Sequence, residues 1–272
     1  MKFIRCTISL LLCFLIICIT SCGSSDEATL KVISTDYIGL TELKSREIDK
    51  EYIENWSNLS SNPYVDYCCH VSLSNGNVVV SNRLAAENIF SMTAGDGYFL
   101  GITQGEFDGW VKYFPNHSAW APEFVGEPQV VVNENCCGFL KISDQLGYLF
   151  TADMWKSGDS YLYELNFSYG SEGFEWSIEK ITRFSDIPVT FTYNENEKMI
   201  YIATLKDLVA FSLESNTIEV LADLSLWEYS GATSIVQLND KLYIGMCMGI
   251  CEYDLAQKEL LWYPMDYSKY VN

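Results

Sequence analysis

The stretch DKLYIGMCMGICEYDLAQKELLWY, residues 240–263, decides the fold. Short apolar runs alternate in it with turn residues, which is typical of antiparallel β-strands rather than helices. We expect strands over 243–246, 250–253 and 259–263, with Gly249 in the first turn. A further apolar run, SIVQL at 234–238, precedes the stretch and makes a fourth strand. The segment therefore predicts one small four-stranded sheet.

The same layout recurs earlier in the chain. Segments beginning with tyrosine lie at 98–103 (YFLGIT), 148–153 (YLFTAD), 201–206 (YIATLK) and 243–248 (YIGMCM), and each precedes a second run with an aromatic centre. Their leading residues Tyr98, Tyr148, Tyr201 and Tyr243 are 50, 53 and 42 residues apart. Four strands per repeat of this length are typical of β-propeller blades, which bury their faces by stacking on one another. We expect the four tyrosines at equivalent positions on second strands.

The copy at 240–263 resembles the blades of quinoprotein-dehydrogenase-like and two-component-sensor-type propellers, and the copy at 198–221 is similar to them. The resemblance implies a fold and no particular activity. We expect an all-β propeller of about five four-stranded blades, with six possible, in a single domain over 29–272. Its degenerate N-terminal blade would contain the hairpin at Asn75-Gly76, and residues 30–34 would pair with C-terminal strands. The alternative is a β-sandwich.

The first residues have the pattern of a secretory signal. Lys2 and Arg5 precede an apolar core of about 14 residues, which is shorter than the roughly 20 needed to span a membrane. The following Ile19-Thr20-Ser21-Cys22 resembles the lipobox of bacterial lipoproteins. The resemblance implies a signal peptide over 1–21, acylation of Cys22, a tether over 22–28, and a lipid-anchored, extracytoplasmic location in the cell envelope.

The charge of the chain excludes some partners. Without Lys2 and Arg5, 15 basic residues remain against 36 acidic ones, a net charge of −21. Nucleic acids and anionic lipid headgroups attract positive surfaces, so we expect neither as a partner. Attachment to the membrane would depend on the lipid at Cys22.

Six cysteines remain after the signal and Cys22 are set aside. An exported location permits disulfides, and the two residues of each adjacent pair, Cys68-Cys69 and Cys136-Cys137, should point to opposite faces of a strand. Cys247 and Cys251 would face each other across a three-residue hairpin loop and form a possible disulfide. The alternative is a buried thiol at one of the two positions.

No complete catalytic or cofactor motif occurs, so we expect no cofactor. His70 beside Cys68 suggests a soft metal site only weakly, because the spacing matches no zinc finger or ribbon, and His117 is expected in a loop. Asp108, Asp153 and Asp207 are candidates for a glycosidase pair, which needs two carboxyl groups within about 5–10 Å.

Four tryptophans, Trp110, Trp120, Trp155 and Trp227, fall in or near connecting segments and are candidate ligand-contacting aromatics, although each could instead pack between blades. The leading interpretation is a membrane-tethered, non-enzymatic module that binds a protein or a glycan. The alternatives are a surface glycoside hydrolase or lyase with carboxylates in the propeller funnel, and an accessory or immunity lipoprotein.

Overall fold

The computed structural model describes residues 29–34, 39–44, 69–82, 89–104, 107–115, 127–153, 159–171, 173–225, 231–246 and 249–264. Within these ranges the regular elements are strands, β1 to β20, and they form five four-stranded sheets. This confirms the all-β propeller with about five blades, and five successive sheets exclude the two facing sheets of a β-sandwich. The described residues include no helix long and apolar enough to cross a membrane.

We number the sheets I to V by the order of their strands. Sheet I holds β1 (Thr29–Ser34), β2 (Gly39–Lys44), β3 (Cys69–Ser74) and β4 (Asn77–Asn82). Sheet II holds β5 (Ile89–Ala94), β6 (Gly97–Gln104), β7 (Phe107–Phe114) and β8 (Gln129–Val132). Sheet III holds β9 (Asn135–Lys141), β10 (Leu146–Ala152), β11 (Ser160–Gly170) and β12 (Gly173–Phe184).

Sheet IV holds β13 (Pro188–Asn194), β14 (Met199–Thr204), β15 (Asp207–Ser212) and β16 (Thr217–Asp223). Sheet V holds β17 (Ala232–Leu238), β18 (Lys241–Met246), β19 (Gly249–Asp254) and β20 (Glu259–Pro264). In sheets II to V each strand pairs antiparallel with the next one along the chain.

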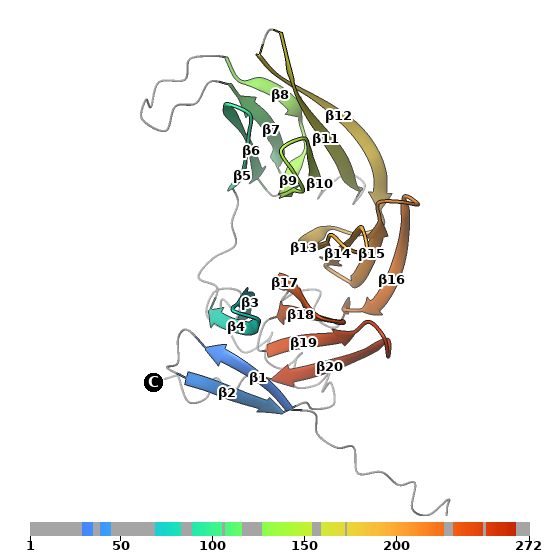
Figure 1. Ribbon diagram of the computed structural model, residues 1–272. Helices are drawn as coiled ribbons and strands as arrows, with labels where there is room; N and C mark the ends of the chain where they lie inside the picture. Colours follow the sequence, from blue (N-terminus) through green and yellow to red (C-terminus); the bar gives the residue numbers. More distant parts are fainter. Residues whose placement is uncertain are drawn as a thin grey trace, which may run out of the picture.

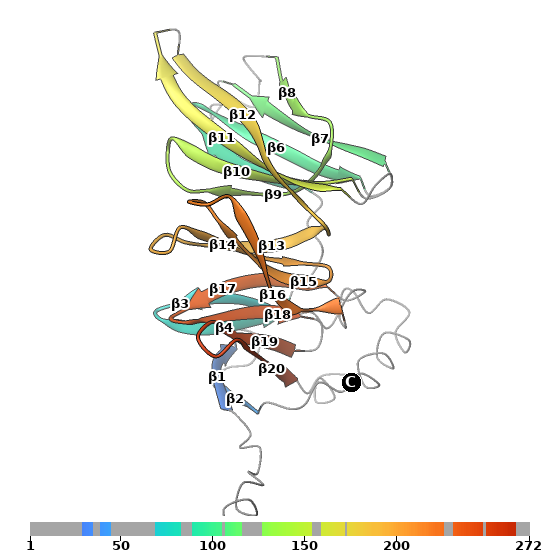
Figure 2. The same cartoon turned by 90° about the vertical axis from the view of Figure 1, so that its right-hand side faces the viewer.

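The sheets follow one another around an arc, with sheet II at one end and sheet I at the other (Figures 1 and 2). The first strands of sheets II to V are in contact, β5 with β9, β9 with β13, and β13 with β17, and β17 contacts the edge strand β3 of sheet I. Three apolar clusters fill the spaces between sheets: one between II and III, one between III and IV, and one that joins IV, V and I. Each sheet is too small to form a core alone, so the interfaces between sheets are the core.

Sheet I has a different topology from the others. Its order is β2-β1-β4-β3, and β1 pairs in parallel with β4 at Ile33↔Val79 and Ser34↔Val80. The expected pairing of residues 30–34 with C-terminal strands was therefore wrong. The predicted Asn75-Gly76 hairpin is confirmed, because Ser74 pairs with Asn77 and both turn residues have positive φ, 50° and 73°. These are the backbone angles of the tight turn that suits twisted hairpins.

All four repeat tyrosines lie on the second strand of their sheet. Tyr148, Tyr201 and Tyr243 are each the third residue of that strand, and each belongs to the cluster facing the next sheet. In sheet II the third residue is Phe99, which packs against Phe139, Phe167 and Trp176 of sheet III. Tyr98 precedes it and stacks on Phe114 of its own sheet, with ring centroids 5.1 Å apart. The equivalence is therefore confirmed for three positions and shifted by one residue at the fourth.

Candidate functional site

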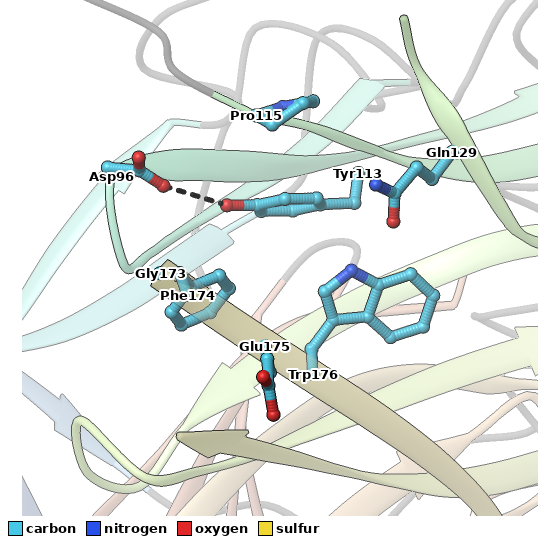
Figure 3. Close-up of a pocket in the computed structure, with 8 residues that line it drawn as sticks. All are labelled: Asp96, Tyr113, Pro115, Gln129, Gly173, Phe174, Glu175 and Trp176. Carbon is cyan, nitrogen blue, oxygen red and sulfur yellow. Dashed lines mark hydrogen bonds between the residues drawn. The ribbon is translucent and has the colours of Figure 1, made fainter. Parts of the chain in front are cut away.

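An aromatic pocket lies between sheets II and III, where the β5–β6 turn and the end of β7 meet the β11–β12 hairpin (Figure 3). Its volume is about 390 Å³, within the range of small-molecule sites. We call it the Trp176 pocket. It is lined by Asp96, Tyr113, Pro115, Gln129, Gly173, Phe174, Glu175 and Trp176.

The length of one hairpin explains why the pocket forms here. β11 and β12 have 11 and 12 residues, whereas the strands of sheet IV have 6 or 7. Along β12 the side chains alternate, with Phe174, Trp176 and Ile178 packed against the cluster between sheets II and III and Glu175 exposed. This period of two lays one apolar face of the hairpin over sheet II and leaves the other face to solvent.

Three aromatic rings form the walls of the pocket. Tyr113 is 2% exposed, and its ring centroid lies 5.5 Å from that of Phe174 and 6.1 Å from that of Trp176. Phe99 packs edge-on to Trp176 at 5.6 Å and supports the indole from within the core. The rings come from β6, β7 and β12, so the pocket depends on both sheets.

Polar groups surround these rings. The Tyr113 hydroxyl donates to Asp96 Oδ1 at 3.3 Å, and burial, followed by the charge of Asp96, raises the pKa of Tyr113. The hydroxyl therefore stays protonated at neutral pH and remains a donor. Glu175 and Gln129 are exposed at the rim, and Gln129 lies at the opposite end of the Tyr113 ring from Asp96 (Figure 3). The pocket thus combines flat apolar walls with carboxylate and amide groups.

Sequence reasoning did not single out Trp176. Of the four tryptophans it selected, Trp110 lies on β7, half-buried outside the pocket, with Lys112 Nζ 4.5 Å from its ring centroid. Trp120, Trp155 and Trp227 lie outside the described residues, as does Cys22. The signal that could have found the pocket is the alternation Phe174-x-Trp176-x-Ile178 in an unusually long run without a turn.

The described cysteines, Cys69, Cys136, Cys137 and Cys251, are buried, and no disulfide joins any two of these four. Cys136 and Cys137 belong to the clusters on opposite faces of sheet III, as strand alternation predicts.

The expected hairpin geometry at Cys251 differs from the observed register. Met246 pairs with Gly249, so Gly249 is in β19 and Ile244 lies opposite Cys251. Cys247 lies outside the described residues, and the bridge between Cys247 and Cys251 stays a prediction that peptide mapping without reduction would check.

The candidate carboxylates are spread over different sheets. Asp153 follows β10 in sheet III, Asp207 begins β15 in sheet IV, and the side chain of Asp108 lies outside the described residues. Burial, followed by the charges of Asp186 and Asp223, raises the pKa of Asp207. No group of three or more metal-ligating side chains occurs in the part of the chain that the structure describes, where His70 lies on β3. His117 is outside it.

Comparisons with known proteins return likenesses of structure only. No protein-family profile matches the chain, and no curated protein matches its sequence. The extracellular domain of a hybrid two component system from B. thetaiotaomicron is 12% identical, with a TM-score of 0.46, over 92% of this chain and 34% of that one. A puromycin hydrolase is 9% identical, with a TM-score of 0.42, over 70% and 33% of the two chains. A Trypanosoma rangeli sialidase is 8% identical, with a TM-score of 0.38, over 70% and 39%. The chain spans about a third of the sensor domain's length.

Proposed function

We propose that this chain is an extracytoplasmic, lipid-anchored binding module that holds a neutral glycan in the Trp176 pocket. The observation that carries the proposal is the pocket itself, in which three aromatic rings meet exposed carboxylate and amide groups. The C–H face of a pyranose ring is weakly positive and packs on the negative face of an aromatic ring. Asp96, Glu175 and Gln129 supply acceptors and donors for the sugar hydroxyls.

The charge of the molecule narrows the class of glycan. The net charge of −21 after the signal, together with the two carboxylates at the pocket, disfavours sugars that carry carboxylate or sulfate groups. The volume of about 390 Å³ suits one or two sugar residues of a longer chain. We therefore expect the ligand to be a neutral sugar, either at the end of a polysaccharide or within it.

The experiment is titration calorimetry of the mature chain with neutral oligosaccharides of glucose, galactose, mannose and N-acetylglucosamine. Trp176→Ala should weaken binding at least tenfold, equivalent to about 1.4 kcal/mol, while Trp176→Phe should retain part of the affinity. Trp110→Ala is the matched control, because it removes an indole that lies outside the pocket. Equal affinities of Trp176→Ala and the unchanged chain, or no binding of any of these sugars, would refute the proposal.

Asp207 lies opposite Asp223 on the neighbouring strand, and burial raises the pKa of Asp207. This pair of carboxyl groups favours one second candidate, a glycoside hydrolase that uses Asp207 as a general acid. Asp186 and Asp223, whose charges act on Asp207, are then the candidates for the second carboxylate. Release of reducing ends from an oligosaccharide, lost in Asp207→Asn, would support this activity. Binding without release would favour the module that only binds.

A further inference from the structure

Alignment of the sheets by register shows a difference at one position. Tyr148 in sheet III lies opposite Glu164, and its hydroxyl donates to Glu164 Oε2 at 3.3 Å. Tyr243 in sheet V lies opposite Glu252, which also accepts from it. The equivalent Tyr201 in sheet IV lies opposite Ala210. The glutamate side chain that fills this position in two blades is therefore missing from the third.

A cavity of about 490 Å³ occupies the corresponding space between sheets IV and V. Its walls are mostly apolar, with Met199, Ala210 and Leu221 contributed by sheet IV and Tyr253 and Leu255 contributed by sheet V. Ala210 is 2% exposed and Tyr253 is 2% exposed, so the inner end of the cavity is set in the core rather than on the surface. It is separate from the Trp176 pocket, which lies between sheets II and III.

The rim of this cavity carries more negative than positive charge. The Tyr201 hydroxyl donates to Glu197 Oε2 at 2.6 Å, and Lys258 Nζ lies 3.1 Å from Glu219 Oε1 across the two sheets. Burial raises the pKa of Tyr201, and Glu197 and then Glu219 add to the effect, so both carboxylates act on its hydroxyl. One ammonium group, that of Lys258, faces these two carboxylates at the cavity.

We propose that this cavity binds a small organic ammonium ion with a short aliphatic body, such as a primary alkylamine. The ammonium group lies at Glu197 and Glu219, where charge-assisted hydrogen bonds are strong. The aliphatic body lies along Ala210 and Leu221 and against the Tyr253 ring, and so fills the space that a glutamate occupies in the other two blades. An anion of the same length is excluded because both carboxylates repel it.

The test uses n-pentylamine as the probe, titrated into the mature chain at pH 7.5, with pentanoate as the comparison anion. We expect saturable one-to-one binding of pentylamine that weakens with added salt, and no binding of pentanoate. Glu197→Gln should weaken pentylamine binding at least tenfold. Ala210→Met should abolish binding by filling the cavity without changing its charge. Trp176→Ala is the control and should bind pentylamine as the unchanged chain does.

Two different variants fill the cavity, so the test remains valid if one of them fails to fold. Ala210→Met changes a core position, so Leu221→Trp, which enters the same cavity from the half-buried β16, provides a second way of filling it. Circular dichroism and thermal unfolding identify the variants that keep the fold. Absence of pentylamine binding, equal binding of pentanoate, or unchanged pentylamine binding in a folded Ala210→Met or Leu221→Trp variant would overturn the proposal.

Discussion

Glu252 shows how a single residue joins three strands. Among the described residues, Glu252 is the acidic residue buried in the core, with 2% of its surface exposed. Its carboxylate accepts hydrogen bonds from Lys241 Nζ and from the hydroxyls of Tyr243 and Tyr263. These partners lie on β18 and β20, on either side of β19. A buried acceptor with several donors stabilises a fold mainly because its loss leaves those donors without partners.

Glu252→Ala should therefore lower the free energy of unfolding by about 2–4 kcal/mol, since it removes hydrogen bonds to a charged group and opens a cavity. The measurement is urea unfolding followed by tyrosine and tryptophan fluorescence. Glu219→Ala removes an acidic side chain that is 58% exposed, so its unfolding midpoint should stay near that of the unchanged chain. Equal midpoints for the two variants would contradict the role of Glu252.

The predicted lipid attachment at Cys22 can be tested independently of the fold. If Cys22 carries the lipid, Cys22→Ala should leave the signal uncut by the lipoprotein peptidase. The variant should also move from the detergent phase to the aqueous phase, because it lacks the acyl chains that stable membrane attachment needs. Phase partitioning and mass spectrometry of the mature N-terminus check this. Serine at position 21 offers the control, since Ser21→Ala keeps a small residue before the cysteine and should be processed normally.

The two candidate sites differ in how far sequence could predict them. The role of Trp176 could have been predicted from the sequence, because Trp176 alternates with Phe174 and Ile178 along one strand. The role of Ala210 could not have been predicted, because an alanine in an apolar run gives no signal of a cavity. Only the strand register shows that Ala210 lies opposite Tyr201. A missing side chain becomes visible only when the blades are aligned in three dimensions.

At the scale of elements, the turns control where the β11–β12 hairpin rests. Gly95 in the β5–β6 turn has φ of +61°, and a Cβ at this position would overlap the Phe174 ring. Gly76 in the β3–β4 turn has φ of +73°, and nothing lies within 4 Å of the place a Cβ would take. The two glycines share a left-handed backbone and differ in their surroundings.

Gly76→Ala should cost about 1–2 kcal/mol of stability, the strain of placing a side chain in the left-handed region. Gly95→Ala should cost more, because Phe174 must also move, and it should weaken glycan binding in the Trp176 pocket. Urea unfolding and calorimetry with the same oligosaccharide give both quantities. A Gly95→Ala variant that matches Gly76→Ala in stability and binds glycan normally would show that Phe174 does not depend on this turn.

For the whole molecule, the repeat predicted sheets II to V because each contains the same order of strand and turn signals. In sheet I the sequence predicted the β3–β4 hairpin but not the place of β1, because β1 joins β4 in parallel and a parallel pair has no hairpin turn to mark it. The shift at Tyr98 has a similar cause. A strand with apolar residues at both 98 and 99 leaves the inward face undecided until the aromatic cluster of sheet III selects Phe99.

Buried tyrosines connect the interfaces between sheets to the pH dependence of the whole molecule. Burial is the first cause of the increases in their pKa above the ordinary value near 10, and neighbouring acidic residues add to it. The increases are largest in six: Tyr113, Tyr148, Tyr163, Tyr201, Tyr243 and Tyr263. The folded chain then holds protons that the unfolded chain releases above pH 10. Stability is fully present below pH 10 and falls as the pH rises further, because the unfolded state binds fewer protons.

We therefore expect the urea midpoint to be level between pH 8 and 9.5 and to decline steeply above pH 10. Exposed tyrosines such as Tyr169 ionise in the folded chain, whereas the phenolate absorbance of the six buried ones should appear together with the loss of circular dichroism. Each tyrosine that stays protonated only in the folded state adds about 1.4 kcal/mol per pH unit to this slope. Tyr243→Phe removes one such group and should make the decline shallower, although Glu252 loses one donor. If all of the phenolate absorbance rose with a midpoint near pH 10 while the fold persisted, these hydroxyls would be open to solvent, contrary to their place between the sheets.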